Sequence, residues 1–415
     1  MPSLSVCMIV RDEESVLPRC LRSVRDLADE ILVVDTGSKD RTAEIARSMG
    51  ARVFHYPWHD DFAAARNFAM DQATGDWILQ IDADEEFYPP DVPRLRDLIR
   101  RDDIDGVHLV LRNFFPSEAT QTDESLEDPM SHPHSVNHFP RLVRNRHTLR
   151  FTGTIHEGIR HFEHALVSDL SIFHYGYAQE DGRKQRRFER NRRLTLRNIE
   201  KHPDDPLAHY YAATTCLAAG LHDEAEQHFL DMVRQADLQQ PRQTHFYQMA
   251  NCHLATLATL RQDYAAAEQF ARAALGPDPD YLDPWLRLGE ACFFQDKFQE
   301  AESAFCRYLD ILGALPQNAR PARYSLYLTG EAHYAWFFLG RLAQLRNDLK
   351  AAQNAYQQSI ALNPRAWGPH YFLGLLYFQI EQTAEAERLW RKALDLDPQN
   401  VAVRQALADL CGKQP

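Results

Sequence analysis

The stretch that decides the fold of the first half of the chain is Trp77-Ile-Leu-Gln-Ile-Asp-Ala-Asp-Glu-Glu-Phe87. Four of its first five residues are apolar, which favours a strand buried on both faces of a sheet. Carboxylates then occupy Asp82, Asp84, Glu85 and Glu86. In open α/β sheets the carboxyl ends of the strands border the crevice that binds ligands, so we expect these acids in such a crevice.

Asp82 and Asp84 are two residues apart, so on an extended backbone their side chains lean to the same side. Two such carboxylates repel each other unless a cation lies beside them. Mg2+ and Mn2+ take oxygen ligands, often one or two carboxylates together with substrate phosphates. A lone D-x-D is also compatible with an acidic turn that caps a helix, but the buried strand before it favours a metal site.

Two earlier strands are expected to end in acids as well. Leu4–Val10 is a near-continuous apolar run followed by Asp12 and Glu13, and Ile31–Val34 is followed by Asp35. Helical spacing of apolar residues follows each run, and this alternation predicts right-handed parallel βαβ units. Three acidic strand ends at one sheet edge require a cation or a donor-rich ligand.

Composition narrows the class of protein further. The 415 residues are enough for two or three domains, and the formal charge of −13 argues against a general nucleic-acid binder. The sequence begins with no signal-peptide pattern and contains no apolar run long enough for a transmembrane segment. Seven cysteines without a C-x-x-C pair favour reduced thiols in a cytoplasmic protein.

Four ordered motifs then resemble family 2 glycosyltransferases of the GT-A fold, over about the first 180 residues: C-M-I-V-R-D-E-E, E-I-L-V-V-D-T-G-S-K-D-R-T, A-A-A-R-N and Q-I-D-A-D-E. The resemblance implies an α/β, Rossmann-like domain that binds a nucleotide-sugar. It places Asp12 and Glu13 near the nucleotide and makes Asp35 an acceptor for the uracil ring. Asp82 and Asp84 would form the D-x-D, with Asp84 the direct metal ligand.

Two residues of these motifs have simpler alternatives. By the resemblance Arg66 faces the nucleotide or its diphosphate, but it is also compatible with a plain ion pair to Asp82 across the crevice. Asp40 would hold the loop after the second strand, which a turn acceptor does equally well.

The acceptor side of the same fold is expected between residues 107 and 177. We predict a strand at 107–115, a hairpin formed by 139–145 and 149–157, and an edge strand at 170–177, with 116–137 as a mobile or solvated loop. In G-T-I-H-E, the resemblance makes Glu157 the candidate general base. It makes His174 a third metal ligand, with His156 as the alternative. Simpler roles are an ion pair of Glu157 with Arg141 or Arg144, and a backbone hydrogen bond for His174.

A basic stretch and a repeat region complete the chain. Nine Lys or Arg residues lie between 183 and 201, which predicts a helix that either binds an anion, such as diphosphate or lipid headgroups, or bridges to the acidic domain. From about residue 204 a period near 34 resembles tetratricopeptide repeats, for example Gly374 with Trp390. We therefore expect a GT-A domain at 1–180, a linker helix at 181–203, and about five repeats plus a capping helix at 204–415.

Together these features predict an inverting, metal-dependent transfer of a hexose or N-acetylhexosamine from a UDP-sugar, with Mn2+ or Mg2+. The arrangement is similar to bacterial peptide S-glycosyltransferases, and its first half is similar to lipopolysaccharide-core glucosyltransferases. A peptide or protein acceptor selected by the repeats is favoured over a saccharide, and a homodimer through the repeats is an open option. The rival class is a non-catalytic scaffold with a degenerate transferase domain. The Q-x-x-R-W signature of processive synthases is missing, which favours a single transfer.

Overall fold

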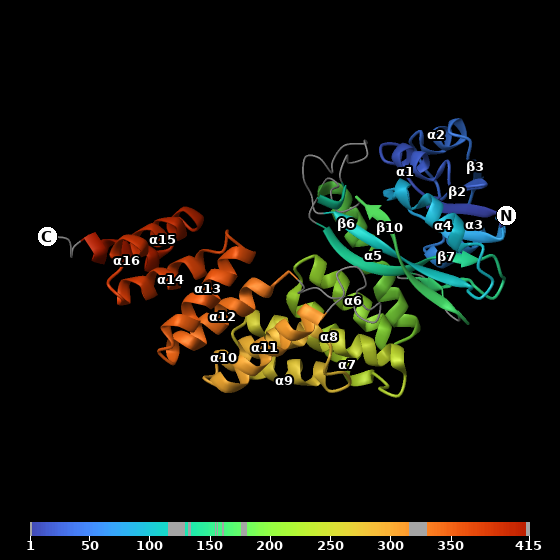
Figure 1. Ribbon diagram of the computed structural model, residues 1–415. Helices are drawn as coiled ribbons and strands as arrows, with labels where there is room; N and C mark the ends of the chain where they lie inside the picture. Colours follow the sequence, from blue (N-terminus) through green and yellow to red (C-terminus); the bar gives the residue numbers. More distant parts are fainter. Residues whose placement is uncertain are drawn as a thin grey trace. The chain divides into compact units, whose positions relative to one another are not determined.

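The computed structural model describes residues 2–114, 129–131, 134–153, 155, 157–159, 162–175, 181–314 and 330–411 (Figure 1). The chain divides into two compact units, of which the first runs over Met1–Leu221 and the second begins at His222. We find no described helix that has both the length and the apolar composition needed to span a bilayer. The predicted boundaries at residues 180 and 203 stay predictions.

The first unit is built on one large sheet. Its strands are β1 (Leu4–Val10), β2 (Glu30–Asp35), β3 (Arg52–His55), β4 (Trp77–Gln80), β5 (Glu85–Phe87), β6 (Gly106–Phe114), β7 (His134–Arg144) and β10 (Ala165–His174). Its helices are α1 (Leu17–Val24), α2 (Thr42–Ser48), α3 (Phe62–Asp71), α4 (Val92–Leu98), α5 (Asp181–Lys201) and α6 (Pro206–Ala218), with 3-10 turns η1 (Pro89–Asp91) and η3 (Pro129–Ser131). A separate ribbon pairs β8 (Phe151–Thr152) with β9 (Gly158–Ile159).

The strand order in the sheet is β3-β2-β1-β4-β7-β6-β10-β5. The first four strands are parallel, as the βαβ pattern predicts, and β7 joins them antiparallel to β4. Val10 is in register with Asp35, and Cys7 is in register with Gln80. The segments that follow β1, β2 and β4 therefore leave the sheet at the same edge, where α/β sheets bind ligands.

Successive residues of the central strands pack into two different hydrophobic cores, one on each face of the sheet, as expected for a sheet covered on both faces. On β1, Leu4, Val6 and Met8 pack with residues of α1 and α4. Cys7, between them, packs on the other face with residues of α3 and of the β8–β9 ribbon. These strands and the helices between them agree with the prediction because continuous apolar runs encode both buried faces.

Two expectations for the acceptor side are wrong. Residues 139–145 and 149–157 do not form a hairpin, because β7 pairs with β4 and β6, whereas β8 pairs with β9. The predicted edge strand is β10, and it lies between β6 and β5. The edge is β5, which begins within the acidic stretch itself and pairs antiparallel with β10. The predicted loop 116–137 falls mainly outside the described residues.

The second unit consists of helices that follow one another as packed neighbours (Figure 1). They are α7 (His222–Gln235), α8 (Pro241–Leu260), α9 (Tyr264–Leu275), α10 (Leu282–Phe293), α11 (Phe298–Ala314), α12 (Ala332–Leu345), α13 (Leu349–Leu362), α14 (Trp367–Gln379), α15 (Thr383–Leu396) and α16 (Val401–Cys411). Glycines allow the helices of the pairs α12–α13 and α14–α15 to pack closely against each other. A Cβ on Gly340 would lie 2.5 Å from the Tyr356 ring, and one on Gly374 would lie 2.5 Å from Trp390. The predicted fit of small against large residues is therefore confirmed.

The turns inside these helix pairs also recur. Gln262 and Asn347 adopt left-handed backbone conformations with φ of 60°, and each is followed by an aspartate that caps the next helix. Asp263 accepts from the amide of Ala266 at 3.0 Å, and Asp348 accepts from that of Ala351 at 3.0 Å. A left-handed residue followed by an N-cap ends one helix and starts the next within a few residues.

Candidate active site

A cleft of about 610 Å³ opens at the carboxyl edge of the parallel strands, and all its lining residues belong to the first unit. Its walls come from the segments after β1, β2 and β4, from the end of β10, and from α3, α5 and the loop before β9. Among the predicted site residues, those that line it are Asp12, Glu13, Arg66, Asp82, Asp84, Glu157 and His174. A volume of this size is typical of small-molecule sites.

Asp84 and His174 form a pair suited to a cation. The Oδ2 atom of Asp84 lies 3.4 Å from Nε2 of His174. On the other side of the ring, Nδ1 lies 2.8 Å from Oδ1 of the buried Asn113, which can only accept a hydrogen bond. Nδ1 is therefore the donor, and in the neutral ring the lone pair of Nε2 faces Asp84. An outer partner that orients a histidine in this way is characteristic of metal ligands.

Arg66 connects the two other central carboxylates. Its Nε donates to Oε1 of Glu157 at 2.6 Å, and its Nη2 donates to Oδ1 of Asp82 at 2.7 Å. Burial lowers the pKa of Arg66, but Asp82 and Glu157 raise it by more, so the net pKa is above its usual value. The predicted ion pair with Asp82 is present, and the same guanidinium also binds the candidate base.

A second arginine supports Asp82 from the neighbouring strand. Nη2 of Arg141 donates to Glu85 at 2.6 Å and lies 3.5 Å from Asp82. Burial raises the pKa of Asp82, yet Arg66 and Arg141 lower it by more, so Asp82 stays ionised. Burial raises the pKa of Glu85 to about 7, against the opposing effect of Arg141. The predicted alternative for Glu157, a pair with Arg141, is replaced by the pair with Arg66.

The loop after β2 is ordered by carboxylates of the first two strand ends. Oδ1 of Asp35 accepts from the amides of Gly37 and Ser38 at 3.1 and 2.8 Å, and its Oδ2 lies 3.3 Å from His55. Burial raises the pKa of Asp35, and the hydrogen bonds from this loop lower it by more. Asp35 itself does not line the cleft as the described residues define it, whereas Thr36, directly after it, does. Its predicted role toward uracil stays a prediction.

Asp12 and Asp40 accept hydrogen bonds from backbone amides in or next to the same loop. Asp12, at φ 56°, accepts from the amide of Lys39 at 2.7 Å, and Asp40 accepts from the amide of Thr42 at 2.9 Å. The amide of Glu13 donates to Thr42 Oγ1 at 2.8 Å, so Glu13 is also tied to this loop. The hydrogen bond of Asp40 to the amide of Thr42, two residues on, fits both the loop-holding role and the turn acceptor, so the role of Asp40 stays a prediction. His156, the alternative metal ligand, lies outside the described residues.

Several side chains that line the cleft were not among the predicted site residues. Trp58 and Phe62 come from the loop before α3 and its first residue, and Arg190 and Asn191 come from α5. The signals were present as an aromatic pair in a polar loop and as a basic run. Their meeting at the cleft depends on tertiary packing, which neither pattern encodes.

Within the part of the chain that the structure describes, two further groups of ligand-type side chains lie outside the cleft. Glu268, Cys292 and Glu300 lie close together, but Arg272 and Lys297 already neutralise the carboxylates. Burial raises the pKa of Cys292 to about 11, which keeps the thiol protonated.

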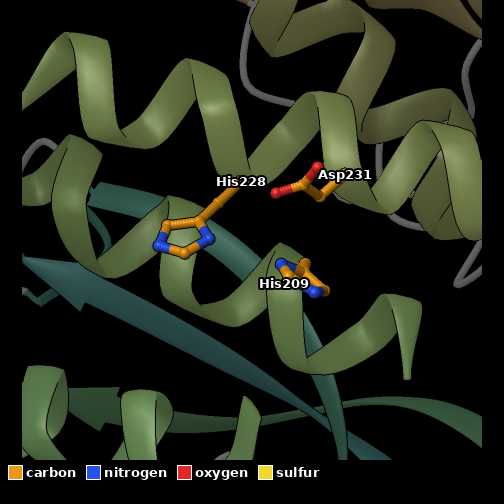
Figure 2. A group of neighbouring side chains, drawn as sticks. All are labelled: His209, His228 and Asp231. Carbon is orange, nitrogen blue, oxygen red and sulfur yellow. The ribbon is translucent and has the colours of Figure 1, made fainter. Parts of the chain in front are cut away.

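The other group is drawn in Figure 2, with His209 on one helix and His228 and Asp231 on another. His209 is on α6, in the first compact unit, whereas His228 and Asp231 are on α7, in the second. These residues do not define a site within either unit.

Comparison with known families agrees with this architecture. Residues 5–162 match the glycosyl transferase family 2 model, and residues 183–239, 333–365 and 368–400 match tetratricopeptide repeat models. The chain therefore combines a family 2 glycosyltransferase domain with tetratricopeptide repeats. The first repeat match begins inside α5, the helix expected to be a linker.

Some relatives of the chain are named as repeat proteins and others as glycosyltransferases. A TPR repeat-containing protein of Synechococcus elongatus is 39% identical over 216 residues, which cover 49% of this chain and 50% of that protein. Glycosyltransferase SunS of Bacillus subtilis is 26% identical over 211 residues, covering 49% of this chain and 47% of SunS. An uncharacterized glycosyltransferase of Rickettsia typhi is 40% identical over 86 residues, covering 21% of this chain and 29% of that protein. The matched segment spans about half the length of the first two relatives.

Proposed function

We propose that this protein is an inverting, metal-dependent glycosyltransferase that moves a hexose or N-acetylhexosamine from a UDP-sugar to an acceptor. The observation that carries the proposal is the cleft itself, in which the D-x-D stands beside His174 and the candidate base Glu157. The family 2 match over residues 5–162 supports the reaction class. A non-catalytic scaffold would have no need of so many buried charges at one sheet edge.

Asp84 and His174 would hold Mn2+ or Mg2+. Their 3.4 Å separation suits two ligands of one ion, since each ligand atom lies about 2.0–2.2 Å from such a metal. When bound, the ion would neutralise the charge of the departing diphosphate. Asp82 is held by Arg66 and Arg141, so we assign it mainly to orienting Arg66, with metal ligation through Asp84.

Glu157 would take the proton from the acceptor nucleophile as the sugar carbon passes through an oxocarbenium-like state. Arg66 binds Oε1 of Glu157, so Oε2 is the atom assigned to accept the proton. The same ion pair fixes the position of the carboxylate and, through Asp82, ties it to the D-x-D. Asp12, Glu13 and Asp35 would shape the nucleotide side of the cleft through the loop that they order.

The repeats and the cysteines bear on two further parts of the proposal, the acceptor and the cellular compartment. Stacked tetratricopeptide pairs build extended concave surfaces that bind other chains, which favours a peptide or protein acceptor selected by the repeats over a saccharide. The same repeats would serve a homodimer. Six described cysteines form no disulfide, which supports the proposal of reduced thiols in the cytoplasm.

A screen of UDP-sugar hydrolysis tests the reaction class, because a transferase without acceptor slowly passes its donor sugar to water. We expect one or two UDP-sugars to release UDP only when Mn2+ or Mg2+ is present, and Asp84→Ala to abolish the release. A library of peptides and a lipid-linked saccharide, offered with the selected donor, then separates the acceptor classes. Hydrolysis that persists after chelation of all divalent ions would contradict the metal-dependent mechanism.

A further inference from the structure

Helix α5 lies beyond the family 2 match, yet it reaches the same cleft. Arg190 and Asn191 line the cleft together with Asp84, His174 and Glu157. The residues one and two turns later dock the helix on the sheet domain. Arg193 and Arg197 both bind Oδ2 of Asp60, at 2.5 and 2.7 Å. The two expectations for this basic helix, anion binding and bridging, therefore apply to different residues of it.

The side chain of Arg190 is held in place by neighbours of the cleft wall. Its guanidinium carbon lies 5.0 Å from the centre of the Phe62 ring, within the range of a cation–π contact. Its Nε and Nη2 each lie 3.2 Å from Oδ1 of Asn191 and donate to it. Arg190 is half-buried, so these contacts limit its rotamers before any ligand arrives.

The aromatic part of this wall is fixed by the residue that docks the helix. Trp58 packs edge-on against Phe62 with ring centres 4.7 Å apart, and its indole nitrogen donates to Asp60 at 2.9 Å. Asp60 thus holds both the aromatic pair that supports Arg190 and the arginines that dock α5. A movement of α5 away from Asp60 would remove Arg190 from the cleft.

The charges of the cleft indicate what Arg190 would bind. The segments after β1 and β4 bring four carboxylates to it: Asp12, Glu13, Asp82 and Asp84. Glu157 adds a fifth carboxylate. Two of the three guanidinium nitrogens of Arg66 already donate hydrogen bonds, one to Asp82 and one to Glu157. The diphosphate of a nucleotide-sugar and these five carboxylates together carry more negative charge than one divalent ion and Arg66 neutralise. Arg190 adds a planar, pre-oriented cation at the same cleft, and guanidinium groups match phosphate oxygens in geometry.

We propose that Arg190 binds the diphosphate of the nucleotide-sugar, with Phe62 and Asn191 as its positioning residues. Helix α5 is then part of the donor site, and not only the connection to the repeats. This inference rests on the proposed function, because it assumes that the cleft takes a nucleoside diphosphate. It adds a binding residue outside the segment that matches the transferase family.

Calorimetry with two probes isolates the phosphate contact. UDP and uridine are titrated into the full-length chain with excess Mn2+, and then into Arg190→Gln and Lys201→Gln. Arg190→Gln should bind UDP about tenfold to a hundredfold more weakly, the range for loss of a charge-assisted hydrogen bond, with uridine affinity unchanged. Lys201→Gln removes a positive charge from the exposed last residue of the same helix, outside the cleft, and should bind both probes within about threefold of wild type.

The alternative outcomes are distinct. Arg190→Gln that binds UDP as tightly as wild type, or that loses UDP and uridine equally, would overturn the assignment of Arg190. A wild-type chain that binds neither probe would overturn the proposed function and this inference with it. Arg190→Lys, which keeps the charge and loses the planar group, should lie between wild type and Arg190→Gln, and it replaces Arg190→Gln if thermal melting shows that variant to be unfolded.

Discussion

Two ion pairs, one in each unit of this chain, lie in different surroundings, and the contrast separates the candidate site from the surface of the repeats. In the sheet unit, Arg66 and Glu157 have side chains only 9% and 12% exposed. In the repeat unit, Arg272 and Glu300 are 47% and 54% exposed, with the solvent beside them. Exposed pairs contribute about 0–1 kcal/mol, whereas burying a pair costs desolvation that its attraction barely offsets. The buried pair is thus weak evidence for stability and better evidence for a ligand site.

The largest expected effect comes from changing the buried carboxylate of the ion pair in the sheet unit. Glu157→Gln should lower the rate of sugar transfer by about 10²–10⁴-fold, because the amide takes no proton from the acceptor. UDP affinity should change by no more than a few fold, since Glu157 is assigned to the acceptor. Steady-state assays and calorimetry on the same preparation give both quantities.

Glu300→Gln is the matched control in the repeat unit, where the lost carboxylate pairs with Arg272 on the surface. Its rate should equal that of wild type. A Glu157→Gln enzyme with unchanged rate would remove Glu157 from the chemistry.

The repeat unit should respond most to loss of packing. Trp390 is 1% exposed and fills the space above Gly374, so Trp390→Ala should lower the free energy of unfolding by about 3–5 kcal/mol. Urea unfolding followed by circular dichroism measures the change, and UDP affinity should stay as in wild type. Trp367→Ala, at a residue 37% exposed, should cost less than Trp390→Ala, because it leaves no closed cavity. Equal losses for both variants would contradict the packing described for α14 and α15.

A histidine in α8 makes the stability of the repeat unit depend on pH. Burial lowers the pKa of His253 from 6.5 to about 4, and its ring stacks on Phe229 at 4.9 Å. Between those two pH values the unfolded chain binds a proton that the folded chain excludes. Stability should therefore fall as pH drops from 6.5 to about 4, by up to about 1.4 kcal/mol per pH unit. As pH falls from 6.5 to about 4, thermal melts should show wild type losing stability relative to His253→Leu, which lacks the titrating ring; parallel curves would refute the buried neutral ring.

The smallest of these effects concerns the orientation of His174. Asn113→Ala removes the acceptor of the Nδ1 proton, so we expect the metal concentration for half-maximal activity to rise about tenfold. The rate at saturating metal should change little, because the ligands themselves remain. A rate that stays low at every metal concentration would point instead to a damaged β6–β10 pair.

The contrast between the units also explains what the sequence could predict. Strands β1, β2 and β4 and the helix pairs follow from local runs and periods, since each element carries its own apolar pattern. Strand β5 was missed because its Glu85 and Glu86 read as a turn, although both side chains are buried through Arg141 and Tyr175. Their partners come from β7 and the segment after β10, which no local pattern brings near.

The candidate site could be predicted from the sequence to about the same extent as the fold. Residues placed directly after apolar strands, such as Asp84, line the cleft as expected. The link from Arg66 to Glu157 spans 91 positions in the chain, and Arg190 reaches the cleft only because α5 docks on Asp60. Long-range pairings of this kind depend on the packed fold and leave no spacing in the sequence.

The most direct test of the central claim is UDP binding with and without metal, in wild type and in Asp84→Ala. We expect wild type to bind UDP tightly only when Mn2+ or Mg2+ is present, and Asp84→Ala to bind it at least about tenfold more weakly under the same conditions. Equal affinity of the two proteins, at every metal concentration, would contradict a cation site at the end of β4.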